Sequence, residues 1–393
     1  MIPSYFEFTN PVRIIAGHKA LDNISFELGQ LQAHKPLILT DQGIKKAGLL
    51  KYVKDAFKET DITFSLFEDI IQDSSEELVR NIAVLFRETD SDSLIAVGGG
   101  SVIDTAKAVN VLVTENSDDL MQFAGAEIIK NPLKPLLVIP TTSGTGSEAT
   151  GVAVIKDQKR NIKMGFSNHY MIPNVAILDP RMTLTLPPLI TAATGIDALT
   201  HAIESYYCLQ KNPVSDSFAW SAAKIISENL IQGIIKPTDS KIRFALSVGA
   251  FLAGVGLSNS IAGMVHSLGH ATGGICGVPH GIAMNIFLPH GLEYNLDKAG
   301  ESIGELLLPL AGTEIYAQIP KDERPNAVLQ HIHDIRNRLY ELTQLPRTLK
   351  EADVPKSKFE AIAKAAINDG SVAFNPEEMS FEDALKVLDK AYE

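Results

Sequence analysis

The first half of the chain alternates short apolar runs with amphipathic segments. The apolar runs are typical of buried strands, and they occupy residues 35–40, 62–70, 93–100, 135–141 and 174–180. Between them, the segments that begin at Ser74 and Ser101 carry apolar residues at helical spacing behind suitable N-terminal caps. Strands that alternate with helices form a parallel sheet through right-handed crossovers. The sequence therefore predicts an α/β domain in this half of the chain.

The pattern changes after the Leu-Pro-Pro sequence at residues 186–188. Strand-like runs almost vanish beyond this point, and long helical patterns follow from residue 190 to the end of the chain. The sequence predicts two domains, an α/β domain over residues 1–185 and an all-helical domain over residues 186–393. A hydrophilic stretch that contains prolines, residues 313–328, predicts a loop between helices of the second domain.

Charge and cysteine content favour small-molecule chemistry. The net charge of -12 opposes binding to nucleic acid or to anionic membranes, because both need a cationic surface. The chain contains no uninterrupted run of about 18 apolar residues, and its first ten residues lack the basic and apolar blocks of a secretory signal. Its two cysteines, Cys208 and Cys276, lie too far apart for a disulfide scaffold. We therefore expect a cytoplasmic protein.

Three glycines follow one of the predicted strands directly. Gly98, Gly99 and Gly100 lie between that strand and the start of the next helix. Glycine lets the backbone approach a phosphate, and the new helix offers unpaired N–H groups at the positive end of its dipole. The turn is therefore a candidate diphosphate site. A tight turn without a ligand remains the alternative, because the motif is not a G-x-G-x-x-G match.

A second loop, residues 140–150, follows another predicted strand and is rich in hydroxyl groups. These belong to Thr141, Thr142, Ser143, Thr145 and Ser147. Such a loop can donate hydrogen bonds to a phosphate, a ribose or a nicotinamide amide. The alternative is a polar surface loop.

Asp41 directly follows the first apolar run, residues 35–40. A carboxylate at the carboxyl edge of a strand can accept both hydroxyls of an adenosine ribose, and it would repel a 2′-phosphate. This placement favours NAD over NADP. The alternative role for a single aspartate here is to cap a turn or a helix.

Five residues of the helical half have the spacing of metal ligands. Asp197 and His201 lie four residues apart on a helical pattern, so that their side chains share a face. His266 and His270 repeat that spacing, and His280 follows ten residues later. One carboxylate with imidazoles suits Fe(II) or Zn(II). Core histidines with local polar contacts are the alternative, and spacing does not distinguish the ligands among the five.

Four motifs together resemble the iron-containing, or group III, alcohol dehydrogenase family. They are residues 98–108, 140–150, 193–207 and 263–281, and they occur in the order of the family. The resemblance implies a nucleotide-binding α/β domain followed by an all-helical metal-binding domain, an architecture shared with dehydroquinate synthase, with the active site between them. It also implies a homodimer or a higher homo-oligomer.

The resemblance assigns roles residue by residue. It implies metal ligands at Asp197, His201, His266 and His280, and it makes His270 a non-ligand that relays the alcohol proton. It implies cofactor contacts by Asp41, Gly98, Gly99, Gly100, Ser101, Thr141, Thr142, Thr145 and Lys163. Two positions depart from the family pattern. The family often has a turn with an asparagine where this chain has residues 71–77, and Asp73 is the nearest substitute for that asparagine. Met284 stands where the family often has an asparagine, behind His280.

The activity implied by the resemblance is that of an NAD(H)-dependent alcohol dehydrogenase or aldehyde reductase. The metal, Fe(II) or alternatively Zn(II), would polarise the substrate oxygen while hydride moves to or from nicotinamide C4. Leu257, Val152 and Ile261 suggest an apolar pocket for a small or medium aliphatic substrate. The alternatives are a hydroxyacid-oxoacid transhydrogenase, a lyase resembling dehydroquinate synthase and a catalytically silent binding protein. The lyase would need basic residues near the metal motifs, which are instead flanked by Ala, Gly, Leu, Met and Val.

Overall fold

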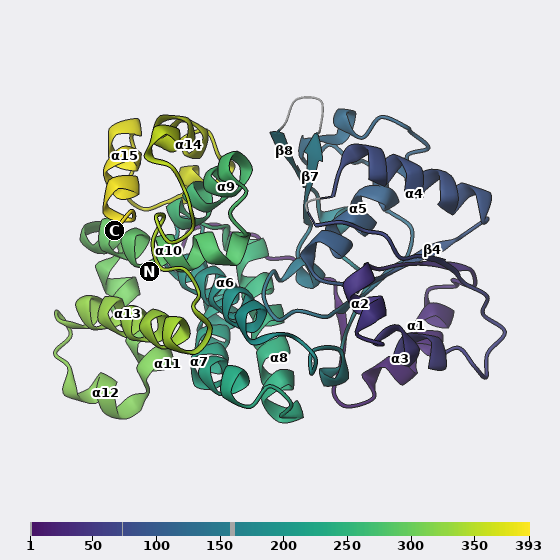
Figure 1. The fold of residues 1–393 in the computed structure, drawn as a ribbon, viewed down its shortest axis with the longest axis horizontal. Coiled ribbons are helices and arrows are strands. Elements are labelled where there is room, and N and C mark those ends of the chain that lie inside the picture. Colours follow the sequence, from purple (N-terminus) through teal and green to yellow (C-terminus); the bar gives the residue numbers. More distant parts are fainter. Residues whose placement is uncertain (1, 73, 158–161) are drawn as a thin grey trace. The chain divides into compact units, whose positions relative to one another are not determined.

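A computed structural model of the protein describes residues 2–72, 74–157 and 162–393. The chain divides into two compact units, an α/β unit over Thr9–Leu186 and a helical unit over Pro187–Glu393 (Figure 1). Residues 2–8 group with the helical unit, whereas the predicted first domain began at residue 1. The ring of Phe8 stacks on that of Phe218, with 5.6 Å between the centroids, and this contact attaches the N-terminal segment to the helical unit.

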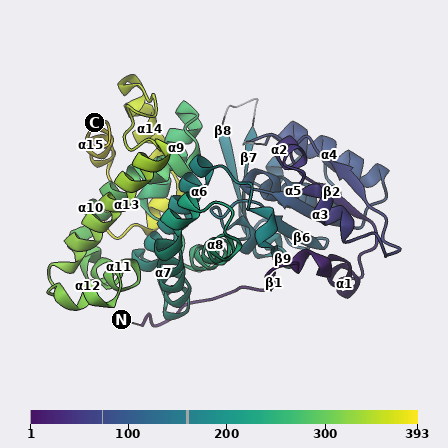
Figure 2. The same cartoon turned by 60° about the horizontal axis from the view of Figure 1, so that its bottom comes forward.

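A parallel sheet forms the centre of the α/β unit. Its strand order is β1-β9-β6-β4-β2-β3, and β6, β9 and β1 are labelled side by side in Figure 2. The central strands are buried on both faces, which explains their continuous apolar sequences. Each predicted run contains one strand, and β1 is an additional edge strand. The bounds are β1 (Arg13–Ala16), β2 (Pro36–Leu39), β3 (Ser65–Phe67), β4 (Ser93–Gly98), β6 (Leu136–Pro140) and β9 (Val175–Leu178).

A second, smaller sheet was not predicted from the sequence. It has the order β5-β8-β7, and β7 pairs with β8 in antiparallel fashion. In β7 buried residues alternate with more exposed ones, and its apolar run covers only residues 152–155 before Lys156 and Asp157. The bounds are β5 (Gly125–Ala126), β7 (Val152–Asp157) and β8 (Ile162–Ser167).

The helices of the α/β unit include both of those predicted. Ser75 caps α4 by accepting a hydrogen bond from the Leu78 N–H, and α5 begins at Gly100, directly after β4 and the glycine turn. Most side chains of α5 are buried, because the helix packs against β4, β6 and β7. The bounds are α1 (Ile24–Gln30), α2 (Gln42–Lys46), α3 (Leu50–Asp55), α4 (Glu76–Glu88) and α5 (Gly100–Thr114).

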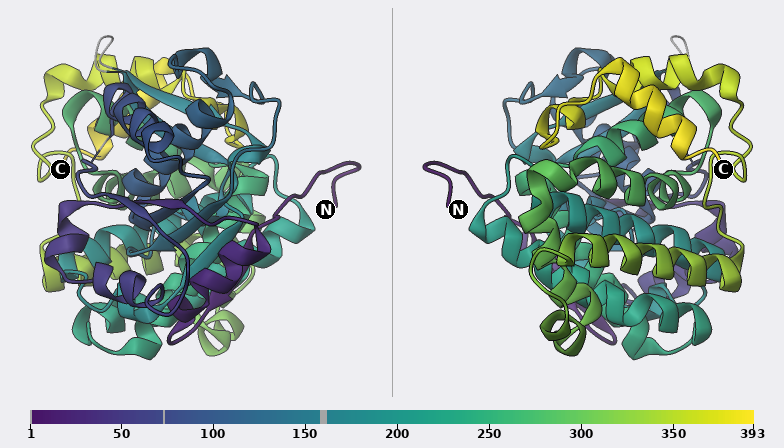
Figure 3. Two further views of the ribbon diagram at one scale, coloured as in Figure 1. Left: turned by 90° about the vertical axis from the view of Figure 1, so that its right-hand side faces the viewer. Right: turned by 90° about the vertical axis from the view of Figure 1, so that its left-hand side faces the viewer.

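The second unit is all-helical over its described residues, as predicted. Its long helices α10 and α13 pack side by side, and the right-hand view of Figure 3 shows them in green and yellow-green. The bounds are α6 (Pro188–Tyr207), α7 (Pro213–Ile235), α8 (Ser240–Ser260), α9 (Met264–Cys276), α10 (His280–Glu305), α11 (Leu307–Ala311), α12 (Thr313–Gln318), α13 (Arg324–Thr343), α14 (Phe359–Ala366) and α15 (Phe381–Lys390).

The prediction of a loop over residues 313–328 was wrong in most of its length. The helix α12 occupies the start of this stretch, and α13 begins at Arg324. Pro325 lies in the first turn of α13, where a proline needs no hydrogen-bond donor and favours helix initiation.

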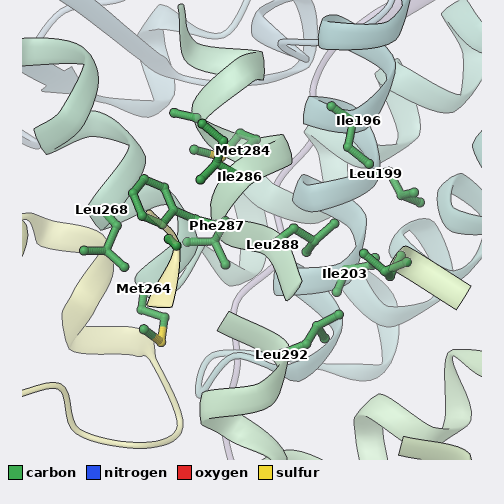
Figure 4. Close-up of a cluster of buried hydrophobic side chains, with 14 of the residues drawn as sticks. Ile196, Leu199, Ile203, Met264, Leu268, Met284, Ile286, Phe287, Leu288 and Leu292 are labelled. Atoms are coloured by element: carbon green, nitrogen blue, oxygen red, sulfur yellow. The ribbon is translucent and has the colours of Figure 1, made fainter. Parts of the chain in front are cut away.

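Apolar side chains of α6, α9 and α10 form part of the core of the helical unit (Figure 4). Ile196 and Leu199 come from α6, Leu268 from α9 and Phe287 from α10, and all four are fully buried. The helix α8 is long and apolar enough to cross a membrane by length and composition. In the structure it packs against α6 and α7, with more than half of its apolar window buried, as core helices do.

Candidate metal centre and cofactor loops

The helix α6 carries a polar stripe on an otherwise apolar surface. Asp197, His201 and Glu204 follow one another at intervals of four and three residues, so that they leave one face of the helix. All three side chains are buried within the helical unit. Buried polar groups in this number need a common partner or a ligand.

Two further histidines complete a cluster with Asp197 and His201. His266 lies in the first turn of α9, and His280 is the first residue of α10. One candidate ligand atom from each of the four residues lies within 4.8 Å of all the others. His280 Nε2 is 3.2 Å from Asp197 Oδ1, and the rings of His201 and His266 stack at a centroid distance of 4.7 Å.

A close approach of α10 to α6 brings His280 into this cluster. A Cβ atom at Gly281 would lie 2.2 Å from the backbone oxygen of Ala193 in α6. Only glycine permits this distance between the two helices. Gly281 thus lets the start of α10 approach α6 closely enough to place His280 beside Asp197.

Burial and local charge keep the cluster in the protonation states that bind a metal. Although burial opposes ionisation, His201 and His280 hold the pKa of Asp197 well below its usual value. Burial lowers the pKa of His201 to about 4, and burial with the charges of His280 and His270 lowers the pKa of His266 well below its usual value. At neutral pH the carboxylate is therefore ionised and these two imidazoles are neutral, as metal ligands must be.

Three buried atoms of the cluster have no hydrogen-bond partner in the part of the chain that the structure describes. They are Asp197 Oδ1, His201 Nδ1 and His266 Nε2. An unpaired buried carboxylate oxygen or imidazole nitrogen is costly. A divalent cation would satisfy Asp197 Oδ1 and His266 Nε2 together, and the set of one carboxylate and three imidazoles suits Fe(II) or Zn(II). The residues present fit a metal ion.

His270 lies one turn after His266 but outside the cluster of four. Its ring stacks on that of His280, with 5.3 Å between the centroids, and its Nδ1 is 2.9 Å from Asp369 Oδ2. Burial opposes ionisation of Asp369, but the hydrogen bond with His270 lowers its pKa to about 2. An ionised carboxylate only accepts hydrogen bonds, so His270 Nδ1 donates to Asp369, and Nε2 is the ring nitrogen left for other partners.

The glycine turn and the threonine loop lie together at one edge of the main sheet. The strands β4 and β6 are parallel neighbours, and the Thr141 N–H donates to the Gly98 backbone oxygen at 3.1 Å. A Cβ atom at Gly100 would lie 2.8 Å from the Thr145 side chain, so the absence of one permits the contact. Gly99 is the N-cap of α5 and has no side chain with which to occupy the free N–H groups of the helix. Ser101 lies in the first turn of α5, and Thr142 lies beside Gly99.

Asp41 and Lys163 occupy other parts of the α/β unit. Asp41 lies beyond β2, the neighbour of β4, and its Oδ1 accepts a hydrogen bond from the Ile44 N–H at 3.0 Å. Asp41 thus caps α2, as one of the two interpretations of the sequence predicted. Lys163 is exposed in β8, and its charge helps to lower the pKa of the buried Asp104, which burial raises overall.

The threonine loop is fastened to α5 by a buried lysine. Lys107 Nζ donates to the backbone oxygens of Thr150 and Val152, each at 2.8 Å, and to Ser147 Oγ at 3.1 Å. Ser147 Oγ in turn donates to Asp104 Oδ1 at 2.6 Å. The Ser147 hydroxyl therefore holds the threonine loop against α5. Burial lowers the pKa of Lys107 to about 8, against the opposing charges of Asp104 and Glu148.

Three residues of these sites were not singled out from the sequence. Glu204 could have been found as the third polar residue of the α6 stripe, and Lys107 as the one basic residue of an apolar helix. Asp369 gives no such signal, because 99 residues separate it from His270.

Two family models match most of the chain. The model described as "Iron-containing alcohol dehydrogenase" matches residues 11–180, and "Fe-containing alcohol dehydrogenase family, C-terminal" matches residues 191–392. The chain belongs to the iron-containing alcohol dehydrogenase family. This membership confirms the resemblance and the two-part fold that the sequence predicted.

Several dehydrogenases are similar to this chain over nearly its whole length. Alcohol dehydrogenase 4 of Saccharomyces cerevisiae is 32% identical, with 96% of each chain covered. The NAD-dependent methanol dehydrogenase of Bacillus methanolicus is 31% identical over 98% of this chain and 99% of its own. A crystal structure of 1,3-propanediol oxidoreductase superimposes with a TM-score of 0.94 at 28% identity, covering 99% of this chain and 100% of the other.

The two departures from the family pattern have different outcomes. Asp73 lies outside the described residues. Met284 is fully buried in α10 (Figure 4), and its Cε lies where a Cβ of Gly269 in α9 would be. Met284 therefore fills space between the two helices that carry His270 and His280.

Proposed function

We propose that this protein is a metal-dependent NAD(H) alcohol dehydrogenase and aldehyde reductase for small to medium aliphatic substrates. The observation that carries the proposal is the buried cluster of Asp197, His201, His266 and His280 in a chain of this family. The names of relatives that act on methanol and 1,3-propanediol support a small alcohol as substrate. We assign the dinucleotide to the α/β unit and the metal to the helical unit.

The four residues of the cluster would hold the ion. When bound, the ion supplies Lewis acidity to the alcohol or carbonyl oxygen, and the nicotinamide exchanges hydride at C4. The protein contributes the ionised carboxylate of Asp197 and the neutral imidazoles of His201 and His266, all three buried, together with His280, whose side chain is 37% exposed. The N–H groups at the start of α5, with Gly98, Gly99, Gly100 and Ser101, would bind the diphosphate. The hydroxyls of Thr141, Thr142 and Thr145 and the ammonium of Lys163 would bind further along the cofactor.

His270 is assigned the transfer of the alcohol proton. Asp369 holds the proton of His270 on Nδ1, which leaves Nε2 as the base. General base catalysis contributes about 10² to 10⁴ to a rate, so the His270→Ala variant is expected to lose at least about a hundredfold in kcat. Its metal content should equal that of the wild type, measured by mass spectrometry of the purified protein. Unchanged turnover, or loss of the metal, would contradict this role.

Asp41 is expected to select NAD over NADP. An Asp41→Asn substitution keeps an oxygen that caps α2 through the Ile44 N–H but removes the charge that repels a 2′-phosphate. The ratio of kcat/KM for NADP to that for NAD should rise at least about tenfold, equivalent to ~1.4 kcal/mol. The matched control is Asp55→Asn, an acid of α3 that pairs with Lys58. An equal ratio in the wild type and the variant would remove Asp41 from cofactor selection.

The proposed function is tested by an anaerobic screen of alcohols and aldehydes with NAD(H) and NADP(H), after loading with Fe(II) or Zn(II). We expect metal-dependent release of free NADH from at least one aliphatic alcohol. A transhydrogenase would instead pass hydride between two substrates without releasing NADH. Failure of every alcohol and aldehyde with either metal would overturn the proposal.

We further propose a cytoplasmic homo-oligomer. The edge strand β1 supports an oligomer, because Ile14 is 40% exposed there and β9 is its one strand partner in the described part of the chain. The two cysteines support a reducing compartment, since neither Cys208 nor Cys276 forms a disulfide in the structure.

A further inference from the structure

Glu204 is a buried carboxylate beside the metal cluster that belongs to neither the cluster nor the cofactor loops. It lies on α6 one turn after His201, and its side chain has no exposed surface. A buried carboxylate without a positive partner is rare unless several donors surround it. Its contacts therefore indicate what it does.

The side-chain contacts of Glu204 lead to the start of α9 or to its own helix. One carboxylate oxygen accepts the Val265 N–H at 2.9 Å, and the Tyr207 hydroxyl is 3.4 Å from the same oxygen. The other oxygen is bonded to Nδ1 of His266. Burial raises the pKa of Glu204 to about 7, although the backbone N–H groups of Val265, Gly263 and His266 that face the carboxylate favour its ionised form.

These contacts determine which nitrogen of His266 is available. The hydrogen bond with Glu204 occupies Nδ1 of His266, so this nitrogen is not available to an ion. Nε2 is the remaining nitrogen, and it is the buried His266 atom that has no partner among the described residues. Glu204 thus leaves Nε2 of His266 for the cluster with Asp197 and the other two histidines.

The backbone directly before α9 adopts an unfavourable conformation. Ile261 has a φ of 64°, a region that β-branched residues avoid and that costs about 1–3 kcal/mol. A Cβ atom at Gly263 would lie 3.0 Å from Glu204 and 2.7 Å from the Asn375 side chain. Asn375 accepts the Met264 N–H at 3.1 Å, next to the bond between Val265 and Glu204. Two side chains from outside α9 therefore fix its first turn, which carries His266.

We propose that Glu204 is a positioning residue of the metal site, which holds Nδ1 of His266 so that Nε2 faces the cluster and thereby sets the affinity for the ion. The inference rests on the proposed metal-dependent function. Carboxylates that hold a ligating histidine through its other nitrogen contribute about 10-fold to 100-fold to metal affinity in other sites.

The test compares the wild type with Glu204→Gln and Glu204→Asp. The amide of the first has one carbonyl oxygen, which cannot accept from both Val265 and His266, and the shorter side chain of the second cannot reach both. We expect each variant to bind Zn(II) about 10-fold to 100-fold more weakly in competition with a chelator. We also expect the absorption bands of bound Co(II) to shift, which a purely structural role for Glu204 would not cause.

The matched control is Glu27→Gln, which replaces a buried carboxylate of the α/β unit that pairs with Arg13. Its Zn(II) affinity and Co(II) spectrum should equal those of the wild type. Thermal melts of the metal-free proteins establish which variants are folded. If Glu204→Gln is unfolded, the test rests on Glu204→Asp. Wild-type affinity and an unchanged Co(II) spectrum in a folded Glu204 variant would overturn the inference. A wild-type protein that binds neither Zn(II) nor Co(II) would instead overturn the proposed function.

Discussion

The His266→Ala variant should retain little bound metal and should lose at least about a thousandfold in kcat/KM, equivalent to ~4 kcal/mol of transition-state stabilisation. The substitution removes one of three imidazoles and leaves the buried Asp197 with fewer partners for a cation. It also leaves Glu204 without the Nδ1 donor that it holds in the wild type. Mass spectrometry gives the metal content, and steady-state assays of the loaded protein give kcat/KM.

The control for this variant is His34→Ala, which replaces an exposed histidine of the α/β unit. It should keep wild-type metal content and activity, because His34 has no place in the cluster. A His266→Ala protein that keeps stoichiometric metal and wild-type turnover would show that the cluster is not the site of the reaction.

Replacing Lys107 with methionine is expected to destabilise the α/β unit by about 3–5 kcal/mol, the range for breaking a buried charged pair. Methionine keeps an unbranched apolar chain but offers no donor to the Thr150 and Val152 oxygens. It also leaves the buried Asp104 without its nearby positive charge. Because the loop over residues 140–150 loses its attachment to α5, NAD should bind at least about tenfold more weakly, a change of ~1.4 kcal/mol.

Chemical denaturation and calorimetric titration with NAD measure the two effects of Lys107→Met. The control is Lys54→Met, because Lys54 is an exposed lysine of α3 in the same unit. A variant with the denaturation midpoint and the NAD affinity of the wild type would show that Lys107 does not hold the loop.

The apolar pattern predicted those strands whose burial is continuous. The strands β2, β4, β6 and β9 are buried on both faces, so each forms an uninterrupted apolar run. The antiparallel pair of β7 and β8 was missed, because the apolar run of β7 covers only residues 152–155 and β8 alternates apolar residues with lysine, glycine and serine. The helix at residues 313–318 was missed because Pro320 and Pro325 in the stretch suggested a break, whereas Pro325 starts the next helix.

Within the candidate metal site, the spacing of the residues predicted which of them share a helix face, but not that the two pairs come together in space. The interval of four residues places Asp197 and His201 on one face, and the same interval applies to His266 and His270. The interval does not describe how α6, α9 and α10 approach one another, which depends on contacts such as that of Gly281 with Ala193. For this reason the residues alone left His270 among the candidates, and only the family resemblance separated it from them.

The cluster of four lies wholly within the helical unit, and the glycine turn and the threonine loop lie wholly within the α/β unit. Under the proposed assignment, a mutation that changes the preference between the two dinucleotides therefore acts on a different folded unit from one that changes the preference between metals. The two traits can drift separately in descendants of this chain, and a laboratory selection for a new cofactor can leave the ion site untouched. Conversely, the ion adds its binding free energy to the helices that hold it and does not directly stabilise the sheet.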